Sequence, residues 1–133
     1  MALDKDFLDR MQKVINSGDR TRKQIDGEVE KEINGLSYMQ QVAAMKLVGS
    51  LDSAEKDLLK KLNAKIAKMT PDAQKVAKQI LAAAKDENLS RNQIGEKIDQ
   101  LYEGTGDALK KELEPAKEEF EELTADVNIQ DFF

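Results

Sequence analysis

The stretch from Asp86 to Lys97 joins two predicted helices and has the length of a calcium-binding EF-hand loop. Asp86, Asn88 and Ser90 stand at its first, third and fifth positions, where such a loop supplies oxygen ligands. The sixth position, however, holds Arg91 instead of the glycine needed for the sharp turn, and the twelfth holds Lys97 instead of the bidentate Glu. We therefore interpret the stretch as a helix–loop–helix junction and expect no tight calcium site, with weak binding of a divalent cation as the alternative.

The chain contains neither cysteine nor histidine, which limits the chemistry available to it. Without histidine it lacks the usual general base and the commonest metal ligand. Without cysteine it has no thiolate nucleophile and no disulfide bond. Catalysis would have to rest on Asp, Glu, Lys or Tyr side chains alone. We therefore predict that the protein is not an enzyme, and that it has no catalytic residues, no metal site and no cofactor.

Glutamates crowd the segment from Glu112 to Glu122, in which Lys117 is the only base. Such a run could attract cations or steer a protein partner. It is more typical of the water-facing side of an amphipathic helix, and we adopt that interpretation.

Methionine and aromatic side chains recur along the chain and could line a pocket for an apolar ligand, because methionine adapts to irregular cavities. We expect core packing instead for those at ordinary helical spacing, which are Phe7, Met11, Met39, Met45, Met69 and Phe120. Tyr38 and Tyr102 are the candidates for a pocket rim, since each joins an apolar ring to a polar tip.

Apolar residues recur every three or four positions along almost the whole chain, which is typical of amphipathic helices. No segment shows the strict alternation expected of a half-buried strand. We predict an all-α fold, a compact bundle of six to seven short amphipathic helices. A single helical domain would cover residues 1–127, and residues 128–133 would form an apolar C-terminal tail.

Capping residues predict where several helices begin. Thr21 with Gln24, and Ser90 with Gln93, have the spacing of a capping box, in which two backbone N–H groups are satisfied reciprocally. Thr70 precedes a proline that suits the first helical position, so we expect its hydroxyl to cap the helix that follows.

Glycine and proline predict where helices end. The segment Tyr38–Val48 is the most apolar in the chain, so we expect a helix there that is buried on more than one side. Gly49 and the serine after it should end this helix, and Asp52, which has capping-box spacing with Glu55, should cap the next one. Pro115 interrupts an apolar stripe near the C-terminus and predicts a kink or break at Glu114.

The charge balance bears on partners and on location. Charged residues make up 35% of the chain, with both signs interspersed, and the net charge is −5. An acidic chain without a basic cluster predicts no binding to nucleic acid, and no apolar run reaches the length of a membrane span. The N-terminal sequence lacks the pattern of a signal peptide. We expect either a cytoplasmic protein or the mature form of a secreted one.

The region from Met69 to Tyr102 resembles the hallmark region of the SXP/RAL family of nematode antigens. The resemblance is carried by Met69-Thr70-Pro71 after a Lys-rich helix, Ala73, an acidic loop ending at Leu89, a helix closing on Leu101-Tyr102, and a following LKKELE segment. It implies a small helical protein, commonly secreted and antigenic, with cation or small-ligand binding and no catalytic residues. The chain departs from the family pattern at Glu32, where an aromatic residue is expected.

Two functions are compatible with these observations. The first is a non-enzymatic binding or antigen-like module that acts through its surface or through a cavity for a small apolar ligand. The alternative is an intracellular structural protein, an acidic helical adaptor for assembly on a larger partner such as a cytoskeletal filament. The oligomeric state stays open.

Phe132 and Phe133 end the chain and are the candidate docking residues for a protein partner. Burying one Phe side chain contributes roughly 1.5–3 kcal/mol, so a chain end that carries two should not stay in water. We expect the tail to fold back onto the bundle, between the first and last helices, with docking on a partner as the alternative.

Overall fold

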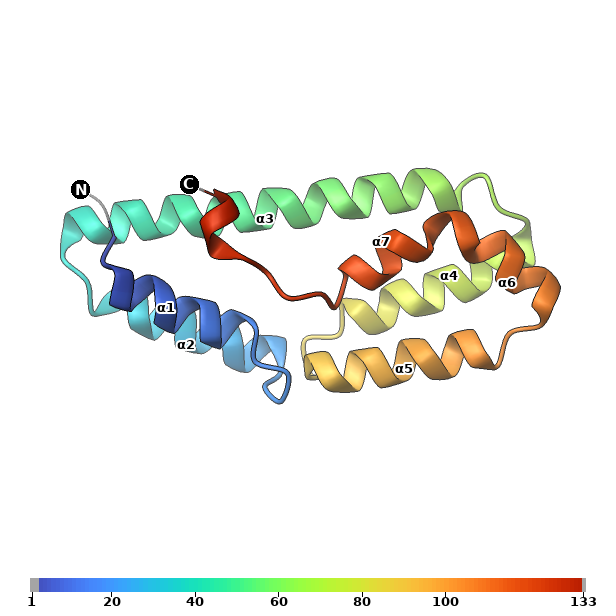
Figure 1. The fold of residues 1–133 in the computed structure, drawn as a ribbon, viewed down its shortest axis with the longest axis horizontal. Helices are drawn as coiled ribbons and strands as arrows, with labels where there is room; N and C mark the ends of the chain where they lie inside the picture. Colours follow the sequence, from blue (N-terminus) through green and yellow to red (C-terminus); the bar gives the residue numbers. More distant parts are fainter. Residues whose placement is uncertain (1–2, 133) are drawn as a thin grey trace.

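The computed structural model describes residues 3–132 of the chain. These residues form helices joined by short turns, with no β-strand among them, so the predicted all-α fold is confirmed (Figure 1). The elements in chain order are α1 (Lys5–Ile15), α2 (Arg22–Asn34), α3 (Tyr38–Ile66), α4 (Pro71–Ala84), α5 (Arg91–Glu103), α6 (Asp107–Leu113), the 3₁₀ turn η1 (Glu114–Ala116), α7 (Lys117–Glu122) and the 3₁₀ turn η2 (Ile129–Phe132).

Helix α3 is 29 residues long and continuous, so the prediction that one helix ends at Gly49 and another begins at Asp52 is wrong. A glycine inside a helix costs only about 0.5–1 kcal/mol relative to alanine. Leu47 and Leu51, on either side of Gly49, both pack in the same apolar core. Their burial outweighs the local preference for a break.

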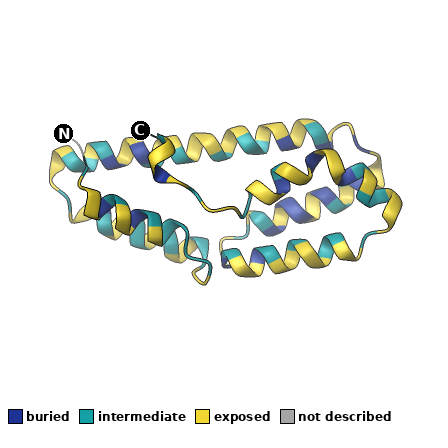
Figure 2. Ribbon diagram, viewed as in Figure 1, coloured by how far each residue is buried: buried dark blue, intermediate teal, exposed yellow. Residues whose placement is uncertain are grey.

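Two apolar cores lie along α3, which runs the length of the molecule (Figures 1 and 2). The N-terminal core lies between α1, α2, the first half of α3 and η2, and its buried members are Phe7, Met11, Ile33, Ala44, Leu47 and Ile129. The C-terminal core lies between the second half of α3 and α4–α7, and its buried members are Leu62, Ile66, Met69, Ala73, Ala77, Ile80, Leu81, Leu113, Ala116 and Phe120. Helix α3 is therefore the element that both cores share.

Several predicted boundaries are confirmed. Both capping boxes are present, with Thr21 and Ser90 each accepting a hydrogen bond from the backbone N–H of the Gln three residues later. Pro115 breaks the last helical stretch into α6, η1 and α7, as predicted. The broken turn is held from outside, because the Lys65 amine donates to the Pro115 carbonyl at 2.8 Å.

Thr70 occupies the predicted N-cap position of α4, but its side chain does not cap that helix. Its hydroxyl donates instead to Glu112 on α6 at 2.8 Å, and its backbone N–H donates to the same carboxylate. Glu119 of the same acidic run pairs with Lys65, and the hydrogen bond from Lys65 lowers the pKa of Glu119. The acidic run is therefore not purely a solvated surface, since two of its carboxylates tie α6 and α7 to the rest of the C-terminal half.

The start of α3 is not buried on more than one side, and this prediction is wrong. Tyr38, Met39, Val42 and Met45 are all exposed, so the expectation that Met39 and Met45 pack in the core is also wrong. Helices α1 and α2 cover only the side of α3 that carries Ala44 and Leu47. The other predicted core residues, which are Phe7, Met11, Met69 and Phe120, are buried as expected.

The Gly49→Ala variant should raise the free energy of unfolding by about 0.5–1 kcal/mol, because alanine favours a helix interior. A Cβ at this position would meet no atom within 4 Å, so nothing opposes the gain. Urea denaturation of the two proteins measures the difference. Gly104→Ala is the control: a Cβ there would lie 3.3 Å from the Gln100 carbonyl oxygen, so no comparable gain is expected. A Gly49→Ala variant less stable than the parent would contradict a continuous α3.

Candidate ligand-binding cleft

The N-terminal ends of α2 and α5 meet and join the two halves of the protein at a point away from α3. Thr21 and Ser90, the two N-cap residues, form an isolated antiparallel bridge. Two reciprocal backbone hydrogen bonds flank it, from Lys23 N–H to the Glu87 carbonyl at 3.2 Å and from Asn92 N–H to the Gly18 carbonyl at 3.0 Å. The chain therefore encloses a space between this bridge, α3 and the tail.

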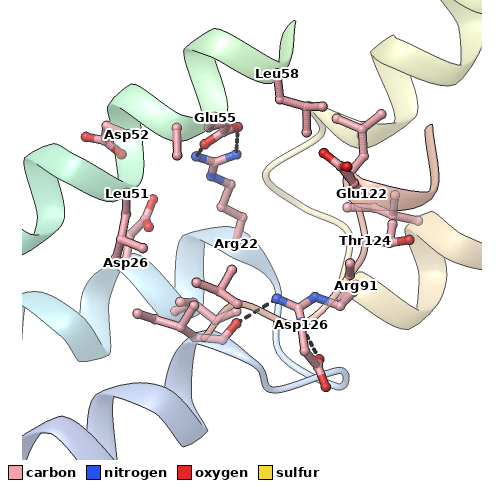
Figure 3. Close-up of a pocket in the computed structure, with 18 of the residues that line it drawn as sticks. Arg22, Asp26, Leu51, Asp52, Glu55, Leu58, Arg91, Glu122, Thr124 and Asp126 are labelled. Carbon is pink, nitrogen blue, oxygen red and sulfur yellow. Dashed lines mark hydrogen bonds and ion pairs between the residues drawn. The ribbon is translucent and has the colours of Figure 1, made fainter. Parts of the chain in front are cut away.

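That space is a cavity of about 510 Å³ (Figure 3). Apolar side chains from α1, α2, α3, α5, the loop before α5 and the tail line it, among them Ile15, Ile25, Leu51, Leu58, Leu89, Ile94 and Phe132. Its volume falls in the range of about 300–1,000 Å³ that is usual for small-molecule sites. We call this space the interlobe cleft.

An ion pair crosses the cleft from α2 to α3. The Arg22 guanidinium donates to both Glu55 oxygens, at 2.7 and 2.6 Å, and the two side chains face each other in Figure 3. The hydrogen bond from Arg22 holds the pKa of Glu55 below its usual value, and the same bond raises the pKa of Arg22. Both groups are about 40% exposed, so the pair is partly screened by water.

Asp26 lies one turn along α2 from Arg22 and lines the same cleft. Burial raises its pKa, the Arg22 charge opposes that shift, and the carboxylates of Glu87, Asp52 and Glu55 add to it. The charge of Arg22 therefore does not cancel the combined effect of burial and of the neighbouring carboxylates on the pKa of Asp26.

Arg91 joins three segments at the edge of the cleft. Its guanidinium donates to Asp126, in the segment between α7 and the tail, at 2.8 Å and to the Ile15 carbonyl at the end of α1 at 2.9 Å. Arg91 is also the first residue of α5, so that helix begins at the position where an EF-hand loop needs its turning glycine.

Two of the three candidate ligands of the Asp86 loop accept hydrogen bonds from backbone N–H groups. Asp86 Oδ1 accepts from Asn88 N–H at 2.9 Å, and Ser90 Oγ accepts from Gln93 N–H at 3.2 Å. Among residues 3–132, no group of three or more Asp and Glu side chains is placed to hold a metal ion. The expectation of no tight calcium site stays a prediction.

The tail and Val127, the residue before it, are held at the C-terminal end of α1 by two amide side chains. Asn16 accepts from Val127 N–H at 2.7 Å and donates to the Val127 carbonyl at 2.8 Å, while Gln12 accepts from Ile129 N–H at 2.7 Å. Ile129 is buried in the N-terminal core, and Phe132 packs half-buried against the same core. The tail thus folds back onto α1 and α3, not between the first and last helices.

The two candidate docking residues differ in what the structure describes. Phe132 lines the interlobe cleft, whereas Phe133 lies outside the described residues. Docking of either residue on a partner stays a prediction. Of the two candidate rim tyrosines, neither lines the cleft: Tyr38 is exposed at the start of α3, and Tyr102 lies under the Lys110 amine beside the C-terminal core.

The sequence did not indicate Arg22, Asp26 or Glu55 as residues of a binding site, and Glu55 was predicted only as the capping partner of Asp52. Each stands on the polar side of an amphipathic helix, where charged residues normally face water. Arg22 and Glu55 belong to different helices, so no local spacing indicates that they pair. Gln12 and Asn16, which hold the C-terminal segment, are easier to find in the sequence. They are uncharged polar residues at the end of a helix, where free backbone groups need hydrogen-bonding partners.

No protein-family model, no curated protein and no solved structure matches the chain. Among the described residues, none of the helices combines the length and the hydrophobicity needed to cross a bilayer.

Substitutions at Glu55 and Asp26 should change stability in opposite directions at pH 7. The pKa of Glu55 is lowered on folding, so its contribution is present above the pKa of the unfolded chain and is lost as pH falls. The pKa of Asp26 is raised, so its ionised form costs stability as pH rises through the folded value. Glu55→Gln should therefore destabilise by up to ~1 kcal/mol, and Asp26→Asn should stabilise.

Chemical denaturation of both variants from about pH 3 to pH 7 measures these effects. Both differences from the parent should shrink toward the acid end, as the carboxylates become protonated. Equal effects of Asp26→Asn at the two ends of the range would contradict the assigned cause.

Ile129→Ala should lower the free energy of unfolding by about 2–5 kcal/mol, because it opens a cavity in the N-terminal core. Gln130→Ala, at the exposed neighbouring position, should change it by less than about 0.5 kcal/mol. Denaturant unfolding of the parent and the two variants measures both differences in the free energy of unfolding. Equal, small effects would show that the tail is not part of the core.

Proposed function

We propose that the protein is a non-enzymatic binding module of the SXP/RAL type that takes a small apolar ligand into the interlobe cleft. The observation that carries the proposal is the cleft itself, with its volume of about 510 Å³ and its lining of Ile, Leu, Val and Phe side chains. Apolar clefts with a few convergent polar groups are the usual form of small-molecule sites.

The polar groups of the cleft support a role in orienting a ligand. Arg22 and Glu55 cross it as a bidentate pair, and Arg91 lies at its edge. These groups give one part of the wall hydrogen-bonding capacity, while Leu51 and Leu58 supply apolar contact nearby (Figure 3). A ligand with an apolar body and one polar end would match this arrangement.

The SXP/RAL assignment rests on the sequence pattern between Met69 and Tyr102. A secreted, antigenic protein of a nematode is what that pattern implies, and binding of a small ligand agrees with it. Weak binding of a divalent cation is the competing activity, and it would involve the acidic side chains outside the apolar lining.

Titration with N-phenyl-1-naphthylamine, a neutral apolar fluorophore, tests the proposal. The parent should enhance its fluorescence with saturable binding of about one equivalent. Leu58→Trp fills the cleft and should weaken binding at least tenfold while the circular dichroism spectrum is kept.

Met45→Lys is the matched control on the same helix, since it removes an exposed apolar side chain away from the cleft lining. It should bind the fluorophore like the parent. Loss of binding in Met45→Lys, with full binding in Leu58→Trp, would place the fluorophore on the surface and overturn the proposal. Adding about 1 mM Ca²⁺ or Mg²⁺ in a separate calorimetric titration reports the competing activity.

A further inference from the structure

Four positions at the start of α3 form an exposed stripe with the spacing of a coiled-coil seam. Tyr38, Val42, Met45 and Gly49 follow one another at intervals of four, three and four residues, which keeps them on one side of the helix. Tyr38 is 77% exposed, Met45 60% and Val42 40%, and contiguous exposed apolar side chains of this kind are a usual mark of interaction surfaces. We call these four positions the α3 seam.

The surroundings of the seam are unusual for this chain. No Asp or Glu occurs from Ile33 to Leu51, and Lys46 is the only charged residue in that stretch. Beyond Gly49 the same side of the helix carries Asp52 and Lys56. The seam is therefore an apolar strip that ends where the charged residues Asp52 and Lys56 begin, and none of its four positions brings a carboxylate against a second copy.

The seam is also complementary in shape to itself. If two α3 helices lie antiparallel about a two-fold axis between Ala43 and Ala44, Tyr38 of each copy faces Gly49 of the other, and Val42 faces Met45. Gly49 is open: a Cβ there would meet no atom within 4 Å, so the position can accept a ring. The largest side chain of the seam thus lies against the position that has none, as a closed, self-complementary interface requires.

We propose that two copies of this chain pair antiparallel through the α3 seam. The paired segment covers roughly 17 Å of helix, which gives an interface below the ~1,200 Å² of a stable complex. The dimer therefore dissociates on dilution and forms only at high protein concentration. Pairing leaves the interlobe cleft free, because Leu51, Glu55 and Leu58, which line the cleft, are not seam residues.

Sedimentation velocity of the full chain from about 5 µM to about 1 mM tests the pairing. The parent should change from monomer to dimer across this range. Met45→Lys should weaken association at least tenfold, because each copy would bring a lysine into the seam. Lys61→Met is the control, since it adds an exposed methionine to α3 outside the seam and should associate like the parent. A parent that stays monomeric at 1 mM, or a Met45→Lys variant that dimerises unchanged, would overturn the proposal.

The absence of native cysteine allows the register to be tested separately. Air oxidation of a mixture of Val42→Cys and Met45→Cys chains should give mainly the mixed disulfide dimer, because the antiparallel register places these positions together. Each variant oxidised alone should cross-link less. Preferential cross-linking of Val42→Cys to itself would indicate parallel pairing and overturn the register.

Discussion

The continuity of α3 is the constraint on which the rest of the structure depends. Ala44, in the N-terminal core, and Leu62, in the C-terminal core, are eighteen residues apart, which is about five helical turns. They therefore lie on the same side of one rod, and both cores must form on that side. Among residues 3–132, no element packs on the opposite side over the first turns, which is why Tyr38 and Met45 are exposed in a segment whose composition suits a core.

A rod with two cores on one side leaves a gap between them, and three contacts close it. The bridge between Thr21 and Ser90 joins α2 to α5, and Arg91 ties α5 to the end of α1. The tail then crosses from α7 back to the N-terminal core, held by Gln12 and Asn16. The cleft is thus a consequence of closing a ring around a space that neither core fills. Part of its apolar lining, such as Leu51 and Leu59, consists of residues that pack against one of the two cores, and the rest, such as Leu58 and Ile94, belongs to neither core.

The charges of the cleft follow from the same geometry. Helices α2 and α3 approach each other here over their polar sides. Arg22 therefore pairs with Glu55, whereas Asp26 lies near several other carboxylates. The Arg22–Glu55 pair adds only modestly to the free energy of unfolding, because it is partly exposed to water. The raised pKa of Asp26 comes first from its burial beside the cleft, and the carboxylates of Glu87, Asp52 and Glu55 add to it.

Local features were readable from the sequence because their physics is local. The capping boxes at Thr21 and Ser90 and the break at Pro115 depend on residues within one turn, and the helical period alone fixes the all-α class. Gly49 could not be placed in this way, since the same residue ends a helix or continues one according to what its neighbours bury. The pairing of Arg22 with Glu55, the exposure of the α3 seam and the cleft itself were decided only by tertiary structure. Each depends on which helices lie side by side, and a single amphipathic pattern carries no information about its partner.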